Sequence, residues 1–522
     1  MPKTFFLTTA IDYTNGAPHI GHAYEKVLAD VIARYHRLKG ERVYFLTGVD
    51  QHGQKVQQSA EKAGVAPQQF VDEITAKFVA LWEKLGVRYD GWAATTEPVH
   101  TQCVQGMLQR LYDEGQIYKD RQEGYYSVRQ EQFLTDKERG ADGEFGPEWG
   151  QVEHRTEENY YFRLAQHKDW LLDHLRAHPD CVTPVFRQTE LINAVEKLSG
   201  DLCISRPKSR LSWGIELPFD RDYVNYVWFD ALTNYISFIG YDPTVSSFNL
   251  QSSSFQEKWP ALHIIGKDIL IPAHGIYWPI MLHALGFPDE QMPKFLVHGW
   301  WNISGAKMSK SLGNVIDPDS LADEHGAEAL RYYLMSDIVT GKDSDFSEER
   351  LIGRFNSDLA NALGNLLNRA LSMTLRYRAG RLTGRGPGTI LLVSAYRDEM
   401  RSSISAGLDR VNGYVVVWNQ EIELKKPWLL AKDEAQAEQL DALLYSLAES
   451  LRIIAILISP VLPKAAHGIF DQLNWKMELS GIEERFSLAE AEWGKLPDGH
   501  IVGKPTPLFP RIETDKTANP RF

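Results

Sequence analysis

Two short stretches of the sequence contain side chains suited to holding phosphate groups. Near the N-terminus, His19 and His22 lie in Pro18-His19-Ile20-Gly21-His22. Imidazole N–H groups can donate hydrogen bonds to phosphate oxygens without adding a fixed charge. Gly21 omits a side chain between the histidines, so a ligand could approach the backbone closely. The ordinary alternative is a polar loop whose histidines cap a helix.

The second stretch is Gly305-Ala306-Lys307-Met308-Ser309-Lys310-Ser311. Lysine ammonium groups are good point charges for phosphate oxygens. Taken alone, a solvated basic turn explains this pattern equally well. In one chain, however, the two stretches could hold a triphosphate from two sides.

The elements around the first stretch place it between a strand and a helix. A β-type run, Thr4 to Ile11, precedes it, and apolar residues at helical spacing follow it until Gly40. A second strand, Arg42 to Val49, completes a β-α-β unit and is followed by Asp50. Helix N-termini favour anions, and ligands of parallel sheets bind beyond the carboxyl ends of the strands. Asp50 could cap the next helix or face a ligand amine.

Two later strands complete this pattern. Leu262 to Ile265 leads into Gly266-Lys267-Asp268, and Lys294 to Gly299 precedes the lysine-containing stretch. Tyr226 to Ala231 opens a helix-like segment that continues to Tyr235. Between Gly115 and Pro218, short aromatic runs alternate with Gly- and Glu-rich loops, which indicates an insertion into the sheet.

Composition limits the remaining possibilities. A length of 522 residues suggests two to four domains, and 43% apolar with 24% charged residues is typical of soluble globular proteins. No apolar run approaches the ~20 residues that a membrane helix needs. The 3 cysteines are far apart and form no C-x-x-C pair, which fits a reducing cytoplasm. The net charge of −13 argues mildly against nucleic acid, although net charge can hide a local basic face.

Such a basic face exists in the C-terminal half. From Leu359 to Arg397 there is no acidic residue, and the stretch contains several arginines. Arginine contacts to phosphates give salt-dependent RNA affinity. An arginine-rich linker is the alternative, and Gly380 to Gly388 is in part such a linker. Amphipathic segments continue through Leu440 to Leu457.

With both stretches in view, the sequence resembles the class I aminoacyl-tRNA synthetases. His19 to His22 matches their HIGH signature and Lys307 to Ser311 their KMSKS signature at every position. Within that class the chain is similar to the methionyl-tRNA synthetase family over nearly its whole length. The supporting stretches are Ala10 to Gly16, Tyr226 to Asp230, Gly266 to Asp268, Tyr277 to Pro279, Lys307 to Pro318 and Asn361 to Arg369.

The resemblance implies a fold and a domain order. We expect a Rossmann-like α/β catalytic domain with a parallel sheet, split by a connective insertion and followed by an all-α helical bundle. The expected boundaries are 1–114 and 219–350 for the two catalytic halves, 115–218 for the insertion and 351–522 for the anticodon-binding bundle. Because little chain remains after the bundle for a dimerising domain, we expect a cytoplasmic monomer without membrane segments.

The resemblance also implies substrates, namely L-methionine, ATP with Mg²⁺, and tRNA(Met). Methionine would lie against one set of residues, with Asp50 holding its α-amino group. ATP would be bound by a second set, in which His19, His22, Lys307 and Lys310 are catalytic. The methionine set is Ala10, Ile11, Tyr13, Asp50, Trp228, Ala231, Tyr235, His274 and Trp278; the ATP set is His19, Gly21, His22, Gly266, Asp268, Lys307, Met308, Ser309, Lys310 and Ser311.

The aromatic character of the methionine set fits a thioether, which packs well against aromatic rings. Without the family match, Trp228 and Trp278 would be read as core. In the bundle, Asn365 and Arg369 lie four residues apart on one helix face and would read anticodon bases, while Trp428 would stack on one.

Two departures from the family pattern are visible. Many members carry zinc knuckles in the insertion, but here the matching position reads Ser127-Val128-Arg129-Gln130, and serine and glutamine are poor zinc ligands. We therefore expect no protein-bound zinc. One residue more than expected also separates Asp268 from His274.

Three other functions account for the sequence less well. A class I synthetase for valine, leucine or isoleucine would usually have a much larger editing insertion, and the cysteine enzyme would have zinc-binding cysteines. A nucleotidyltransferase that acts without tRNA does not account for the basic helical C-terminal region. A non-catalytic RNA-binding relic does not account for the intact HIGH and KMSKS signatures.

Overall fold

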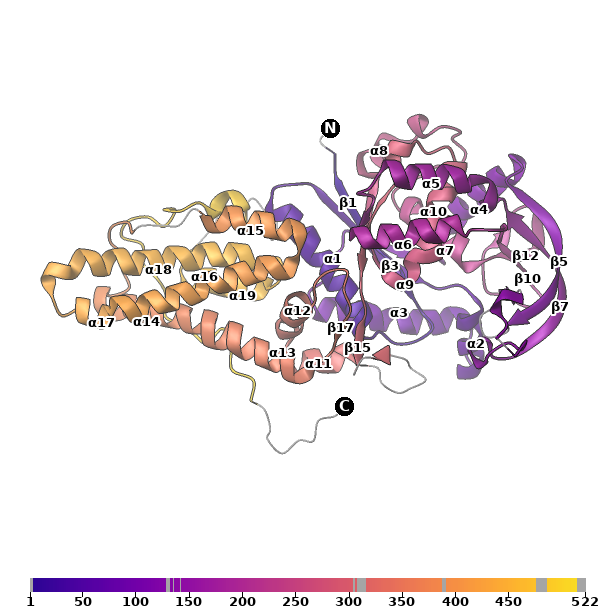
Figure 1. The fold of residues 1–522 in the computed structure, drawn as a ribbon. Helices are drawn as coiled ribbons and strands as arrows, with labels where there is room; N and C mark the ends of the chain where they lie inside the picture. The colour runs from indigo at the N-terminus through magenta and orange to yellow at the C-terminus, as the bar shows by residue number, and fades with distance from the viewer. Residues whose placement is uncertain are drawn as a thin grey trace.

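The computed structural model describes residues 3–127, 132–134, 136–140, 142–303, 306–307, 316–386, 391–475 and 486–513. A 7-stranded sheet lies at the centre of the catalytic part, and all of its pairings are parallel (Figure 1). Its strands run in the order β2, β3, β1, β13, β14, β8, with β4 also paired to β3. Their bounds are β1 Phe5–Thr9, β2 Asp12–Tyr13, β3 Val43–Asp50, β4 Gly91–Ala94, β8 Val182–Thr183, β13 Ala261–Gly266 and β14 Lys294–His298.

The central strands are buried on both faces, as expected of a parallel sheet. Neighbouring residues of β1 show this directly, because Phe6 and Leu7 point to opposite faces and belong to two different apolar clusters. One cluster lies under α1 and α3, and the other under α4, α7 and α10. The helices of the catalytic part and its insertion are α1 Ile20–Leu38, α2 Gln54–Ala63, α3 Pro67–Lys84, α4 Pro98–Asp113, α5 Lys168–Ala177, α6 Val185–Glu196, α7 Val227–Ser237, α8 Ser253–Lys258, α9 Lys267–Ile269 and α10 Trp278–Ala284.

The predicted α/β fold with a parallel sheet is confirmed, and the predicted strands differ from the observed ones by a few residues at their ends. The largest difference is at the first strand, where β1 ends at Thr9 and the short β2 resumes at Asp12. Asp50 is the last residue of β3, whereas α2 begins only at Gln54 after Gly53. The helix-cap alternative for Asp50 is therefore wrong.

The region predicted as an insertion contains a long curved hairpin, β5 with β7, at the far end of the molecule (Figure 1). It belongs to a 4-stranded antiparallel sheet, and a 3-stranded sheet packs beside it. The bounds are β5 Ile117–Ser127, β6 Gln132–Leu134, β7 Val152–Phe162 and β9 Leu202–Cys203, then β10 Ser205–Pro207, β11 Glu216–Leu217 and β12 Asp220–Asn225.

The predicted boundaries 115–218 do not follow the observed sheets at two places. β8 lies within them but pairs with β14 of the catalytic sheet. The 3-stranded sheet also spans residue 218, because β11 precedes it and β12 follows it. The chain thus returns to the catalytic sheet before the insertion is complete, and the domain limits remain a prediction.

A small sheet and three helices connect the catalytic part to the bundle. The sheet contains β15 Trp301–Ile303, β16 Ala306–Lys307 and β17 Ser344–Asp345. The helices are α11 Pro318–His325, α12 Ala327–Ser336 and α13 Glu348–Arg354. Since α13 crosses residue 351, the predicted limit between catalytic domain and bundle falls inside a helix.

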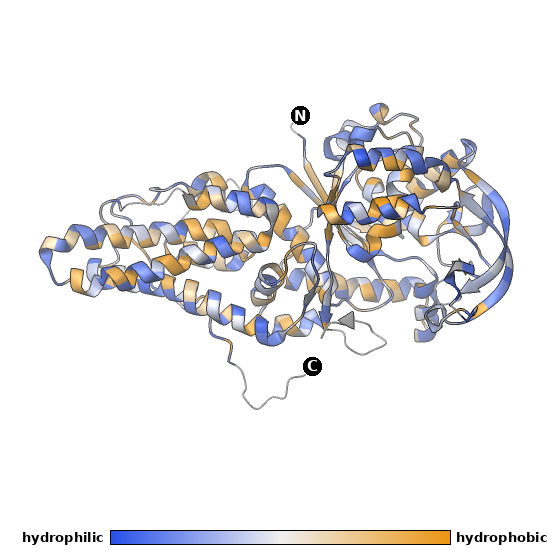
Figure 2. Cartoon of the chain, viewed as in Figure 1, coloured by the Kyte–Doolittle hydropathy of each residue, from blue (hydrophilic) through white to orange (hydrophobic). Residues whose placement is uncertain are grey.

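The C-terminal region is helical, as predicted, and extends away from the sheet (Figure 1). Residues 348–378 run without a break through α13, a π-helical segment Phe355–Gly364 and α14. Figure 2 shows blue and orange residues alternating along these helices, the amphipathic pattern of a bundle. The bounds are α14 Asn365–Arg378, α15 Leu391–Ser402, α16 Ile404–Lys425, α17 Pro427–Leu430, α18 Ala437–Ile458 and α19 Pro463–Gln472.

One apolar cluster runs from α1 through α12 to α18, so the catalytic part and the bundle share a continuous core. Across the described residues, none of the helices combines the length and apolarity needed to cross a membrane.

Candidate active site

His19 and His22 form the N-terminal cap of α1. His19 is the cap residue, and its Nδ1 accepts from the backbone N–H of Gly21 at 3.1 Å. The Nδ1 atom of His22 in turn accepts from the backbone N–H of His19 at 3.1 Å. The two rings lie 3.8 Å apart between centroids. A Cβ on Gly21 would come within 3.0 Å of the His19 ring, which explains the glycine.

This capping determines the chemistry of both rings. A neutral imidazole that accepts at Nδ1 carries its hydrogen at Nε2, so each ring offers one N–H donor there. Both side chains line a cavity beside the N-terminus of α1. The capping and phosphate-binding interpretations are therefore compatible, because the cap fixes the tautomer that can donate.

That cavity has a volume of about 250 Å³ and lies at the carboxyl edge of the sheet. It brings together the described residues that were predicted for nucleotide binding, His19, Gly21, His22, Gly266 and Asp268. Asp268 accepts a hydrogen bond from Trp300 Nε1 at 3.1 Å. The prediction missed other lining residues: Asp12, Glu25, His298, Gly299, Trp300 and Trp301.

A buried lysine organises the wall of this cavity. Lys26 is fully buried and its Nζ donates to Ala10 O at 3.0 Å, to Asp12 Oδ1 at 2.9 Å and to Glu25 Oε1 at 2.9 Å. His298 adds a further contact from Nε2 to Glu25 Oε2 at 3.0 Å. Its Nδ1 lies 2.8 Å from Gly299 O.

Asp12 has fewer hydrogen-bond partners than the other charged residues of this network. Its Oδ2 is buried and has no hydrogen-bond partner among the described residues. Burial raises the pKa of Asp12 to about 7, although the neighbouring Lys26 ammonium opposes the shift. Lys26 and Glu25 thus form the fully ionised pair, and Asp12 titrates near neutrality beside them.

A second cavity of about 380 Å³ adjoins the first and shares Ala10, Ile11, Tyr13 and Ile269 with it. It gathers the residues predicted for methionine, with one exception. The predicted residues that line it are Ala10, Ile11, Tyr13, Asp50, Trp228, Ala231, Tyr235 and His274; those missed are Lys55, Tyr226, Val227, Leu232 and Ile269.

Trp278 is the exception, because it lies in the core. It is fully buried, and its Nε1 donates to His263 Nε2 at 3.0 Å. Its ring packs behind Tyr235 at 5.8 Å between centroids. Trp278 therefore supports the cavity wall without lining it, whereas half-buried Trp228 does line the cavity.

His274 lines the cavity in a fixed neutral form. Its Nδ1 donates to Ile269 O at 2.9 Å, so its Nε2 accepts from the Tyr235 hydroxyl at 2.7 Å. Burial lowers the pKa of His274 to about 4. The segment between Asp268 and His274, which is one residue longer than expected, leads into the irregular π-helical stretch Leu270–Tyr277. Despite the additional residue, His274 lines the cavity.

Asp50 places a buried carboxylate at the wall of the second cavity. Behind it, Asp230 is held by His52 Nδ1 at 2.8 Å and His100 Nε2 at 2.7 Å. Burial alone would raise the pKa of Asp230, but the two histidines hold it at about 2. Burial and the nearby Asp230 charge raise the pKa of Asp50 well above its usual range. An ionised Asp50 would strongly favour a bound ammonium group.

The lysine-containing stretch is described only at its start. The backbone of Lys307 pairs with Asn302 between β16 and β15. The predicted residues Met308, Ser309, Lys310 and Ser311 lie outside the described residues, and so does the Lys307 side chain.

The bundle carries an open groove of about 780 Å³ between the π-helical segment, α14 and α16. Asn365 and Arg369, the two residues that the family resemblance assigned to anticodon reading, both line it from the same face of α14. Arg369 contacts Glu423 at 2.6 Å and Asn365 contacts Asn419 at 3.4 Å. Trp428 is not among its lining residues but lies four positions after one of them, Leu424, and is 39% exposed.

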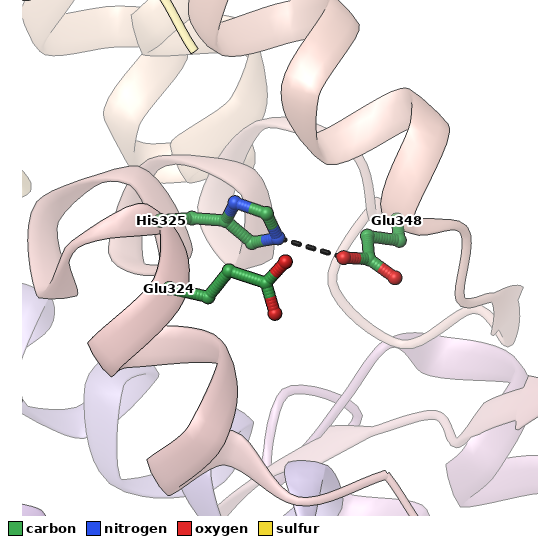
Figure 3. A group of neighbouring side chains, drawn as sticks. All are labelled: Glu324, His325 and Glu348. Atoms are coloured by element: carbon green, nitrogen blue, oxygen red, sulfur yellow. Dashed lines mark hydrogen bonds and ion pairs between the residues drawn. The ribbon is translucent and has the colours of Figure 1, made fainter. Parts of the chain in front are cut away.

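Metal-ligating side chains converge at one place in the described part of the chain, where Glu324, His325 and Glu348 meet (Figure 3). His325 Nε2 contacts Glu348 Oε1 at 2.8 Å. Its Nδ1 is buried and has no hydrogen-bond partner among these residues, although metal-bound histidines usually donate from their second nitrogen. The group is thus better explained as a histidine–carboxylate hydrogen bond than as a metal centre.

The comparisons with known proteins agree with this geometry. The family model described as "tRNA synthetases class I (M)" matches residues 5–143 and 149–371. The methionine–tRNA ligase of Deinococcus radiodurans is 41% identical over 536 residues, covering 99% of this chain and 76% of that protein.

The chain belongs to the methionyl-tRNA synthetase family.

A second member of the family, from Caldanaerobacter subterraneus, is also 41% identical and is covered over 80% of its length. Among solved structures, the Mycobacterium tuberculosis methionyl-tRNA synthetase in complex with methionyl-adenylate has a TM-score of 0.87 at 36% identity, over 98% of this chain and 100% of that one. The match to this methionyl-tRNA synthetase extends over both cavities and the bundle.

Sequence reasoning missed the groups that stabilise the family's motifs. His52 and Asp230 lie 178 positions apart, and Glu25 and His298 lie 273 apart, so no local pattern joins them. Only Lys26 could have been recognised from the sequence, because a lysine on the apolar face of a helix is buried and needs a buried counter-ion.

Asp12→Asn should change how stability depends on pH. The folded-state pKa of about 7 lies above the unfolded value of 3.8, so the folded protein binds the proton more tightly and stability falls as Asp12 ionises. The amide mimics the protonated carboxyl, so the variant should gain stability relative to the wild type as pH rises from about 4 to about 7, between the unfolded and folded pKa values, and the difference should then level off. Urea unfolding across that pH range measures this difference. A constant difference would show that the Asp12 proton is not linked to folding.

Proposed function

We propose that this chain uses ATP to attach methionine to tRNA(Met), with the two adjoining cavities as its active site. The observation that carries the proposal is their shared wall, which lets one extended molecule occupy both. An aminoacyl-adenylate is such a molecule, and the Mycobacterium tuberculosis relative is named as a complex with methionyl-adenylate.

The methionine side chain would occupy the cavity that contains Trp228, Tyr235 and His274. Aromatic rings favour a polarizable thioether. The neutral His274 and its bond to Tyr235 would present a polar but uncharged surface near the sulfur. Asp50 would accept the α-ammonium group, and its charge would be restored by that contact despite its raised pKa.

Adenylate formation would proceed by in-line attack of a methionine carboxylate oxygen on the α-phosphorus of ATP. The bond from that phosphorus to the pyrophosphate oxygen breaks, and the pyrophosphate leaves with the electron pair. His19 and His22 would donate from Nε2 to phosphate oxygens at the N-terminus of α1, where negative charge is favoured. Gly266 and Asp268 would hold the ribose. None of these steps requires a nucleophile from the protein, so positioning supplies most of the catalysis.

The remaining contacts to the ATP phosphates would come from the lysine-containing stretch, which would close over them. Its residues are Lys307, Met308, Ser309, Lys310 and Ser311. Mg²⁺ bound through ATP phosphates would need only one or two protein oxygens, and Asp12, which lines the cavity, has an Oδ2 without a hydrogen-bond partner among the described residues. When bound, Mg²⁺ would neutralise part of the charge on the phosphate oxygens. In the second step, a ribose hydroxyl of the terminal adenosine of tRNA attacks the methionyl carbonyl, and AMP leaves.

We further propose that the enzyme carries no zinc and acts as a cytoplasmic monomer. The three cysteines lie on separate elements, and burial raises the pKa of Cys103 to about 12 and of Cys181 to about 11, which disfavours the thiolates that zinc binds. Stoichiometric zinc by elemental analysis would contradict the first point, and a dimer mass by light scattering would contradict the second.

Amino-acid-dependent ATP–pyrophosphate exchange tests the function directly. With each of the twenty amino acids in turn, methionine should give the strongest stimulation, because the cavity combines an ammonium-binding carboxylate with an aromatic wall. Stimulation by leucine or valine instead would favour a synthetase for another apolar amino acid. Exchange with methionine but no charging of tRNA(Met) would favour a nucleotidyltransferase that acts without tRNA.

Trp428→Ala tests the proposal that the bundle reads the anticodon with Asn365, Arg369 and Trp428. Loss of base stacking should weaken tRNA binding by about 1–3 kcal/mol and leave ATP–pyrophosphate exchange nearly unchanged. The matched control is Leu429→Ala, since Leu429 is 49% exposed on the same short helix and offers no aromatic ring. Equal losses of binding and exchange in the Trp428 variant would show a structural role instead.

A further inference from the structure

Arg331 in α12 lies where the catalytic part meets the bundle. It is 1% exposed and makes hydrogen bonds to segments from both sides. Its Nε donates to Val461 O at 2.9 Å, and one terminal nitrogen donates to Leu85 O at 3.1 Å. The other terminal nitrogen donates to Asp30 Oδ2 at 2.7 Å and to Pro460 O at 3.0 Å.

On the catalytic side, the partner is the helix that begins at His19. Asp30 is fully buried in α1 and also accepts from Arg34 Nε at 2.8 Å and from the backbone N–H of Arg88 at 2.9 Å. Because α1 is unbroken from Ile20 to Leu38, Asp30 and His22 move as parts of one rigid element. They are about 12 Å apart along the axis, at 1.5 Å per residue.

On the bundle side, the partners are carbonyls of the turn between α18 and α19. A second residue of α12 contacts the same region, since Glu328 accepts from the backbone N–H groups of Lys464 at 2.6 Å and Ala465 at 3.0 Å. Within the described part of the chain, Glu328 forms no hydrogen bond or ion pair with α1. Arg331 is therefore distinguished from its helix neighbour by reaching both sides of the joint.

The geometry points to Arg331 as a positioning residue that couples the bundle to α1, so that tRNA held by the bundle is aligned with the histidines at the start of α1. This inference rests on the proposed function, since it requires tRNA to bind the bundle. Its specific content is that Arg331 contributes to transfer of methionine to tRNA and not to adenylate formation.

The chemistry of the guanidinium group explains why arginine suits this position. Its planar fork of N–H donors serves one carboxylate and three carbonyls from separate segments, which fixes their relative orientation. A lysine ammonium could keep the ion pair with Asp30 but could not reach all three carbonyls. Burying a charge costs free energy that an apolar contact would avoid, so orientation is the better explanation than stability for its presence.

Three variants separate coupling from local packing. Arg331→Lys keeps the charge and loses the fork. Arg34→Lys perturbs contacts on the catalytic side, to Asp30 and to the Gly86 carbonyl, and Glu328→Gln perturbs the contact to the backbone of α19 on the bundle side. For each variant, three quantities are measured: methionine-dependent ATP–pyrophosphate exchange, tRNA(Met) affinity, and the single-turnover rate of methionine transfer to tRNA with a native or an altered anticodon.

Arg331→Lys should keep exchange and tRNA affinity within about threefold, while transfer to native tRNA falls about tenfold, a size typical of coupling between sites. The anticodon change should then slow transfer less in this variant than in the wild type. Both control variants should retain the wild-type anticodon dependence. The inference is overturned if Arg331→Lys lowers exchange and transfer in parallel, or if the anticodon dependence of transfer stays unchanged. A wild-type enzyme without methionine-dependent exchange would instead refute the proposed function.

Discussion

The buried ammonium group of Lys26 is the interaction on which the site most depends. It links the turn between β1 and β2 to α1, through Ala10 O and Asp12 on one side and Glu25 on its own helix. That turn provides the wall shared by both cavities, and α1 provides the two histidines. A displacement of Lys26 would therefore separate the amino-acid side from the phosphate side. Buried ion pairs contribute little net stability, so its main effect is to fix these two elements relative to each other.

A second buried network has a similar role on the other side of the sheet. Asp230 is held by His52 and His100, which come from the segment after β3 and from α4. The arrangement fixes the chain just after Asp50 and places a permanent negative charge behind it. Two carboxylates close together give a region that binds a cation well, because the cation relieves their repulsion. The Lys26 network thus orients the hydrogen-bond donors His19 and His22, which suit an anion. The Asp230 network places a negative charge next to Asp50, which suits a cation.

The Lys26 network matters beyond the cavities because α1 belongs both to the site and to the contact between the catalytic part and the bundle. Its N-terminus presents His19 and His22, its middle carries Lys26, and its next turn carries Asp30, which receives Arg331 from α12. The apolar cluster around α1 continues into α18 without interruption. A single helix, α1, thus connects the catalytic site to the bundle. Its polar contacts, at Lys26 and Asp30, lie on successive turns of a largely buried surface.

The sequence by itself determined the elements and the edge of the sheet at which the site lies, and the family resemblance supplied most of the individual site residues. Strand-to-helix order and the carboxyl-edge rule put His19, Asp50, Gly266 and Asp268 at one edge, because parallel strands end together. Spacing on one helix face likewise placed Asn365 and Arg369 on the same groove. These signals are local, since each depends only on residues close in the chain.

Tertiary structure alone decided the rest. Trp228 and Trp278 are both tryptophans in or next to helices of this part of the chain, but only packing against His263 and Tyr235 puts Trp278 in the core. The partners of Asp230 and Arg331, and the contact of His298 to Glu25, come from segments more than a hundred positions away. The strand β8 joins the catalytic sheet from within the predicted insertion. Periodicity shows that a side chain faces inward. It cannot show which distant group will meet that side chain, because that depends on how the completed layers pack.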